Sequence, residues 1–203
     1  MQENWIDTLV TRVNPDLIYS ETKENPPAKL TSKAWSCSSA GFYRARSCIF
    51  EATGKFRAET LVIYPCVGHF LPVFGCEYIE LPSRSLAVID FHPIGGNLEP
   101  INEFLYAEAD RTVEKSTVYD LSEFFSHKMW HVRGGKEVYG PFKEASERYI
   151  EQYYKMLRKN PLNEVDHASY NAYMGQNDPA HGILKAYFGK EFADDYIREF
   201  LFR

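Results

Sequence analysis

The sequence predicts an α+β fold in which an antiparallel β-sheet packs against helices. Residues 41–92 alternate between apolar and polar side chains, the period-two pattern of strands, and short turns separate the runs. Beyond residue 120 the apolar residues instead recur at helical spacing. Strands joined by short turns and followed by helices indicate an antiparallel sheet covered by helices. At 203 residues, we expect one domain spanning residues 1–203.

The first predicted element is a short helix. Apolar residues recur at helical spacing from Trp5 to Val13, and Pro15 ends the pattern. The next residues are mostly polar and lead to the Pro26-Pro27 pair. We therefore expect a surface loop between this helix and the first strand.

Four strands are predicted next, each bounded by turn residues. Thr53-Gly54-Lys55 supplies the first turn, and Pro65 ends the second strand. Pro93 and the Gly95-Gly96 pair are the stop signals at the end of the fourth strand. The predicted strands are Phe42–Phe50, Phe56–Tyr64, Leu71–Leu81 and Ser85–Ile94.

The remaining sequence predicts helices. One helix begins at Asp120, a suitable N-cap, and extends to Met129. After Gly134-Gly135, a long amphipathic helix spans about Phe142 to Leu157. Two further helical stretches follow, one after Asp178-Pro179 and one after Gly189.

Asp90 is the most unusual residue of the predicted sheet, because strands disfavour aspartate. Alternation places Val88, Asp90 and His92 on one face of their strand. Asp90 is either a solvated aspartate at a sheet edge or a buried functional acid, and the residues alone favour neither.

Two further charged positions have competing interpretations. Asp178 before Pro179 is typical of a helix N-cap, which is compatible with a carboxyl that also faces a pocket. Arg44 and Arg46 share one face of a strand. The pair indicates either an exposed sheet surface, which such alternation favours, or a site for an anionic ligand or acidic partner.

Composition restricts the possible partners. A net charge of −5 argues against a protein devoted to nucleic acid. No apolar run approaches the roughly 20 residues of a membrane helix, and we recognise no signal peptide. The spacing of the four cysteines matches neither a redox pair nor a zinc motif, so we expect reduced thiols and a cytoplasmic protein.

Motifs for several common chemistries are absent. The sequence contains no dinucleotide fingerprint, P-loop, zinc-protease motif or nucleophile elbow. His127 and His131 have the i,i+4 spacing of a metal pair on a helix, but no third ligand is evident. We therefore expect no bound metal.

Several segments together resemble the ferredoxin-dependent bilin reductases. Leu71–Glu77 and Val88–Pro93 are similar to the central region of that family. Asn177–Leu184 resembles its C-terminal block, and Tyr119–Trp130 is also in keeping with it. The resemblance runs in order from about Phe42 to the end of the chain.

The resemblance implies a three-layer α/β/α sandwich with a central antiparallel sheet. It implies that biliverdin IXα binds between the sheet and the C-terminal helices. It also implies that reduced ferredoxin delivers single electrons through bilin radicals, with no metal or flavin on the enzyme. The acidic residues of the family's motifs are carried over onto Asp90 and Asp178.

The reaction needs a source of protons, which explains why a bilin reductase would hold acids in its pocket. A one-electron donor brings no protons, so an acid must protonate the reduced carbon atoms. An aspartic acid among apolar groups stays protonated near neutral pH, which suits Asp90 and Asp178. His92 shares the strand face of Asp90, where it is placed to orient or reprotonate that acid.

The remaining pocket residues and partners follow from the same resemblance. Val88 and Phe74 are the expected apolar contacts of the pigment. Its two propionates require basic side chains near the pocket mouth, for which we choose Arg44 and Arg46. Ferredoxin is acidic, so this protein needs a basic face to bind it. We expect the protein itself to be a monomer. The cations available for that face are Lys128, Arg133, Lys136, Arg148 and Lys155.

The reaction is the least constrained expectation. The end of the Asp90 strand resembles the branch that makes 15,16-dihydrobiliverdin and phycoerythrobilin. We expect two successive reductions, from biliverdin through 15,16-dihydrobiliverdin to phycoerythrobilin. The alternatives are the first reduction alone, a bilin carrier without redox chemistry, and a structural module in which Asp90 faces solvent.

Overall fold

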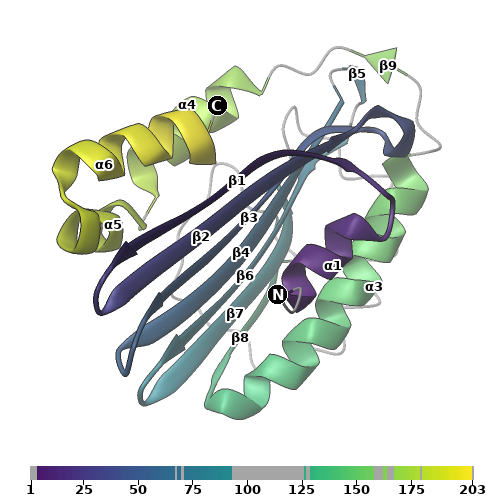
Figure 1. Ribbon diagram of the computed structural model, residues 1–203. Helices are drawn as coiled ribbons and strands as arrows, with labels where there is room; N and C mark the ends of the chain where they lie inside the picture. Colours follow the sequence, from purple (N-terminus) through teal and green to yellow (C-terminus); the bar gives the residue numbers. More distant parts are fainter. Residues whose placement is uncertain are drawn as a thin grey trace.

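The computed structural model contains a seven-stranded sheet in which all neighbouring strands are antiparallel (Figure 1). It describes residues 4–66, 68–69, 71–92, 126, 129–157, 162–163, 167–178 and 180–202. The strands, in spatial order, are β1 (Asp16–Asn25), β2 (Ala28–Cys37), β3 (Phe42–Ala52), β4 (Phe56–Pro65), β6 (Val73–Leu81), β7 (Arg84–His92) and β8 (Trp130–Gly134). A separate short pair joins β5 (Gly68–His69) to β9 (Leu162–Asn163).

Helices cover both faces of the sheet, which confirms the α+β, three-layer prediction (Figure 1). One face carries α1 (Trp5–Thr11) and α3 (Tyr139–Leu157). The other carries the C-terminal elements α4 (Ala168–Asn177), α5 (Ala180–Phe188), α6 (Lys190–Asp195) and the π-helical η4 (Tyr196–Leu201). Two short 3₁₀ turns are η1 (Ser38–Ala40) and η3 (Lys136–Val138).

The main core lies between the sheet and the pair of helices α1 and α3. Alternate residues of β7, including Phe91, point into this core, where the Phe91 ring stacks on Tyr149 with centroids 5.5 Å apart. Tyr153 lies one helical turn further along α3, and its ring centroid is 5.7 Å from that of Phe74. Each such fully buried aromatic contributes roughly 2 kcal/mol through burial of apolar surface.

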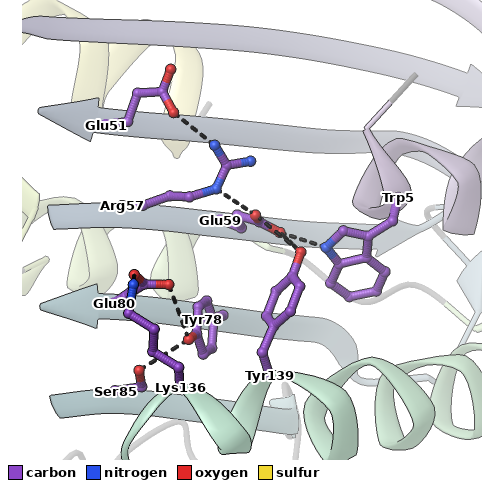
Figure 2. Close-up of polar contacts among 9 residues, drawn as sticks. All are labelled: Trp5, Glu51, Arg57, Glu59, Tyr78, Glu80, Ser85, Lys136 and Tyr139. Carbon is purple, nitrogen blue, oxygen red and sulfur yellow. Dashed lines mark hydrogen bonds and ion pairs between the residues drawn. The ribbon is translucent and has the colours of Figure 1, made fainter. Parts of the chain in front are cut away.

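A polar cluster on the same face is built around Glu59, whose carboxylate is 1% exposed (Figure 2). It accepts hydrogen bonds from Trp5 Nε1 at 2.6 Å, Arg57 Nε at 2.7 Å and the Tyr139 hydroxyl at 3.2 Å. These donors come from α1, β4 and the start of α3. The cluster therefore fixes both helices to the sheet through one satisfied buried charge.

The loop predicted between α1 and the first strand is wrong, because residues 16–37 form β1 and β2. The Pro26-Pro27 pair lies in the turn that joins them. β1 is an edge strand that exposes nearly all of its side chains, so it lacks an apolar face. In β2 the buried positions include Ser32, whose hydroxyl is paired with the Tyr196 hydroxyl at 2.6 Å, which weakens the apolar signal.

Trp130 and His131 belong to β8 and not to a helix end. The helical placement of His131 is therefore wrong, and His127 lies outside the described residues. The helix expected from Asp120 also falls almost wholly outside them. Within the described ranges, no helix is both long and apolar enough to span a membrane.

The central strands and the long helix were predicted correctly. β3, β4, β6 and β7 occupy the expected segments, and α3 contains the predicted Phe142–Leu157 stretch. Pro82 and Ser83 alone form the turn of the β6–β7 hairpin, with Leu81 paired to Arg84. All four cysteines are free thiols, as expected.

Candidate active site

A cavity of about 620 Å³ lies between the sheet and the C-terminal helices. Strands β3, β4, β6 and β7 line one side, while α4, α5 and η4 line the other. Most of its lining is apolar, with a few charged groups among the apolar residues. This size and composition are typical of a site for a small organic molecule.

Glu77 is the carboxyl that the sheet contributes to this cavity. It lies on β6 between its cross-strand neighbours Thr60 and Val88, and it accepts a hydrogen bond from Thr60 Oγ1 at 3.1 Å. Burial, together with the negative charge of Asp178, raises the pKa of Glu77 to about 7. Glu77 therefore holds a proton for much of the time at neutral pH.

Glu77 is not among the site residues expected from the sequence. A glutamate on a strand resembles a solvent-facing position, and nothing nearby in the sequence marks the helices that cover it. The available signal was the position of Glu77 on the strand face that also holds Gly75, between the apolar neighbours Cys76 and Tyr78.

Asp178 is the carboxyl that the helices contribute. It stands between α4 and α5, and its Oδ1 accepts a hydrogen bond from the backbone N–H of Ala180 at 2.7 Å. The predicted N-cap is therefore confirmed. Burial raises the pKa of Asp178 above its ordinary value, although the Ala180 hydrogen bond and the charge of Arg46 oppose this shift. The Asp178 side chain therefore both caps α5 and lines the cavity.

Arg46 brings a positive charge to the same cavity. The side chain is 2% exposed, and its guanidinium carbon lies 4.9 Å from the centre of the Phe202 ring. Its Nε makes no hydrogen bond to the described residues. The exposed-surface interpretation is thus wrong for Arg46. Arg44 instead donates to the backbone oxygen of Phe200 at 2.6 Å and does not line the cavity.

His92 lines the cavity at the far end of β7. Its Nδ1 is hydrogen-bonded to the Tyr170 hydroxyl at 2.6 Å. Burial, with a smaller effect of the Arg46 charge, lowers the pKa of His92 to about 3, so the imidazole is neutral. A side chain at Gly75 would place its Cβ 3.0 Å from the His92 ring, so only glycine leaves room for the imidazole there.

Asp90 is fully buried, which contradicts the structural module with a solvent-facing Asp90. It shares the strand face of Val88 and His92, yet it is not among the residues that line the cavity. Both carboxylate oxygens are engaged by Ser126, one by the backbone N–H at 2.7 Å and the other by the hydroxyl. Burial raises the pKa of Asp90 to about 7 against the opposing effect of these hydrogen bonds.

The structure brings some of the expected residues together and separates others. Val88, His92, Arg46 and Asp178 line one cavity. Phe74 does not, because it lies in the main core, where its ring is 5.7 Å from Phe91. Among the described residues, no group of histidine, cysteine and acidic side chains has an arrangement suited to a metal ion.

The cavity also contains a hydrogen-bonded chain that the sequence analysis missed. Cys48 Sγ lies 3.1 Å from the Tyr196 hydroxyl, which is in turn bonded to Ser32. Burial raises the pKa of the Cys48 thiol, so it stays protonated.

Comparisons with known proteins agree with this architecture. The chain is 27% identical over 195 residues to 15,16-dihydrobiliverdin:ferredoxin oxidoreductase of Prochlorococcus marinus (strain NATL1A), covering 86% of this chain and 81% of that one. The enzyme of the same name from Nostoc punctiforme is 23% identical over 214 residues, covering 96% and 87%.

A solved structure shares the fold. Phytochromobilin synthase from tomato, in complex with biliverdin, superimposes with a TM-score of 0.80 at 18% identity, over 97% of this chain and 81% of that one. The sequence profile of one family, described as ferredoxin-dependent bilin reductase, matches residues 3–203. With almost its whole length matched, the chain belongs to the ferredoxin-dependent bilin reductases.

Proposed function

We propose that this bilin reductase acts on biliverdin IXα and converts it through 15,16-dihydrobiliverdin to phycoerythrobilin, with electrons from reduced ferredoxin. The observation that carries the proposal is a mainly apolar cavity with two protonatable carboxyls on its walls, Glu77 on the sheet and Asp178 at a helix start. A flat tetrapyrrole fits between these walls, with one acid on each side of its plane.

The roles of the two carboxyls follow from the electron supply. Each electron that reaches the pigment makes its carbon atoms more basic, and ferredoxin brings no proton with it. Glu77 and Asp178 are the acids that line the cavity, and the pKa of each is raised by burial. Asp178 therefore keeps its expected role as a proton donor, and Glu77 joins it.

The expected roles of Asp90 and His92 stay predictions. Asp90 shares the cavity face of β7 but does not line the cavity, and Ser126 binds both of its oxygens, so we favour Glu77 over Asp90 for direct proton transfer. The neutral imidazole of His92 is suited to orient the pigment through a hydrogen bond.

The relatives are named for 15,16-dihydrobiliverdin and ferredoxin, which supports this bilin as a compound on the route. The names contain no second reduction, so the step to phycoerythrobilin rests on the two carboxyls of the cavity. Each two-electron reduction of a double bond takes up two protons, so the two steps together take up four, and each carboxyl is reprotonated from solvent between deliveries. Carboxyls on opposite walls can serve two regions of the pigment. The alternative is the first reduction alone, which takes up two protons.

An anaerobic assay tests the proposal. Purified protein is mixed with biliverdin, ferredoxin and a system that reduces ferredoxin, and the products are separated by chromatography. Phycoerythrobilin as the final product supports the full proposal, whereas accumulation of 15,16-dihydrobiliverdin shows the single-step reaction. Binding without any reduction would contradict it and leave a bilin carrier. Glu199→Gln, at an exposed carboxylate, is the matched control for the site variants below.

A further inference from the structure

Arg84 and Arg133 stand side by side at one end of the cavity. Arg84 begins β7, and Arg133 lies on β8 directly across from Leu86. Residues paired across strands point to the same face, as do residues two apart on one strand, so both arginines share the face of Leu86. Such diagonal neighbours lie about 7–8 Å apart. Both side chains contribute to the cavity lining.

Among the residues that the structure describes, neither arginine is neutralised. Within the described ranges, Arg84 and Arg133 have no ion-pair or hydrogen-bond partner for their guanidinium groups. Cations elsewhere on the sheet differ: Lys136 binds Glu80 at 2.7 Å, and Arg57 binds Glu51 at 2.7 Å. Two adjacent guanidinium groups without a partner in the described part of the chain repel each other, so an anionic ligand between them is favourable.

Arg46 has a different electrostatic situation. It is almost fully buried, and its charge lowers the pKa of both Glu77 and Asp178, so carboxyl groups of the protein already respond to it. A ligand carboxylate near the protein surface would have to enter the apolar interior to contact Arg46. Arg84, which is exposed, can bind such a group at the rim without this cost.

We propose that Arg84 and Arg133 together bind the two propionate groups of the bilin. This inference rests on the proposed function, because it assumes a flat tetrapyrrole with two carboxylates. A guanidinium pairs with a carboxylate through two parallel hydrogen bonds, so two arginines match two propionates. The pair replaces the expected choice of Arg44 and Arg46 as propionate ligands.

The spacing along β7 orients the pigment. Val88, opposite Glu77, is four residues beyond Arg84, which corresponds to about 13 Å at the rise of a strand. One pyrrole ring, its propionate chain and an extended arginine side chain cover that distance together. Carboxylates held at the β7–β8 end therefore leave the conjugated rings between Glu77 and Asp178.

Binding of biliverdin and of its dimethyl ester to the full-length protein tests the assignment. The ester keeps the ring system and removes both negative charges. We expect the wild type to bind biliverdin at least tenfold more tightly than the ester, and the Arg84→Met/Arg133→Met variant to bind both with equal affinity. Arg84→Lys/Arg133→Lys keeps the charges and should restore part of the preference. Arg198→Met, at an exposed ion pair, serves as the matched control and should keep the whole preference.

Two results would overturn the assignment. One is a methionine double variant, with an unchanged melting temperature, that still prefers biliverdin over its ester. The other is unchanged pigment affinity with slower ferredoxin-driven turnover, which would place the arginines at the electron donor instead. If the wild type binds pigment with the expected preference but never reduces it, the proposed function fails while the propionate site stands. If the wild type binds neither pigment, both fail.

Discussion

Glu59 and Glu77 lie on neighbouring strands, yet they serve opposite faces of the sheet. The register pairs Glu59 with Tyr78 and Thr60 with Glu77, so the two carboxyls point in opposite directions. Glu59 accepts hydrogen bonds from three donors, Trp5, Arg57 and Tyr139 (Figure 2). Glu77 accepts one bond from Thr60 and otherwise faces the cavity.

The difference shows that the partners of a buried carboxyl decide its use. Charged and polar donors around Glu59 stabilise an anion that joins helices to the sheet. The apolar surroundings of Glu77 favour the protonated acid instead, because they provide little solvation for a charge. One face of the sheet therefore holds a carboxylate in a network of donors, and the other presents a protonatable acid to the cavity.

The largest expected effect is a loss of turnover in Glu77→Gln that Glu59→Gln does not show. Glu77→Gln removes the proton while the amide oxygen can still accept the Thr60 hydrogen bond, so we expect turnover to fall by about 10²–10⁴-fold. Biliverdin affinity should change little. Single-turnover absorbance measurements with reduced ferredoxin test this, and Glu59→Gln measured well below its melting temperature should keep the wild-type rate. A Glu77→Gln protein with normal turnover would exclude it as a proton donor.

Asp178→Asn extends the comparison to the helical wall. Asparagine remains a good N-cap, so the bond to the Ala180 N–H and the stability of α5 should survive. We expect turnover to fall by about 10²-fold, or the reaction to stop at an intermediate, because the second acid is missing. Product chromatography measures this outcome. Complete conversion at the wild-type rate would leave Asp178 with its capping role alone.

Glu59→Gln should act on stability and not on chemistry. The neutral amide weakens three hydrogen bonds to a buried charge, which should lower the free energy of unfolding by about 2 kcal/mol. Urea unfolding followed by tryptophan fluorescence measures the change, and Trp5 within the cluster should report it directly. Equal stability of Glu59→Gln and wild type would show that the cluster is dispensable.

The smallest effect is a pH dependence. A proton donor acts in its acid form, so with Glu77 as the donor and a pKa of about 7 we expect turnover to be about tenfold lower at pH 8 than at pH 6. The folded state also holds this proton more tightly than the unfolded state does, so its contribution to stability is lost as the pH rises from about 4.5 to 7. Glu77→Gln should remove that contribution, whereas Glu59→Gln should leave it. A flat rate profile would contradict the role of Glu77 as an acid.

The sequence predicted the elements whose burial pattern is strong. β3, β4, β6, β7 and α3 present apolar residues at regular spacing to a single core, so local periodicity was sufficient. β1 failed as a prediction because an edge strand exposed on both sides has no such period. β8 failed because a five-residue strand next to Gly134-Gly135 resembles the end of a helix.

The site could be predicted only in part, for a related reason. Asp178 has a local signal, the helix cap before Pro179, and His92 follows from the strand face that it shares with Asp90. Glu77 and Asp90 look alike in sequence, as acids within apolar strands. Which of them faces the cavity depends on distant segments: Ser126 lies against Asp90, whereas Asp178 acts on Glu77 across the cavity.

The two-residue turn of Pro82 and Ser83 restricts which insertions the β6–β7 hairpin can accept during evolution. Because side chains alternate, a single inserted residue that shifted the pairing of β6 with β7 by one position would turn His92 toward the wrong layer while Glu77 stayed in place. Insertions that keep the parity of the hairpin would instead preserve the site. We therefore expect lineages to vary the length of this hairpin in steps of two residues, and to tolerate odd changes only where a bulge absorbs them.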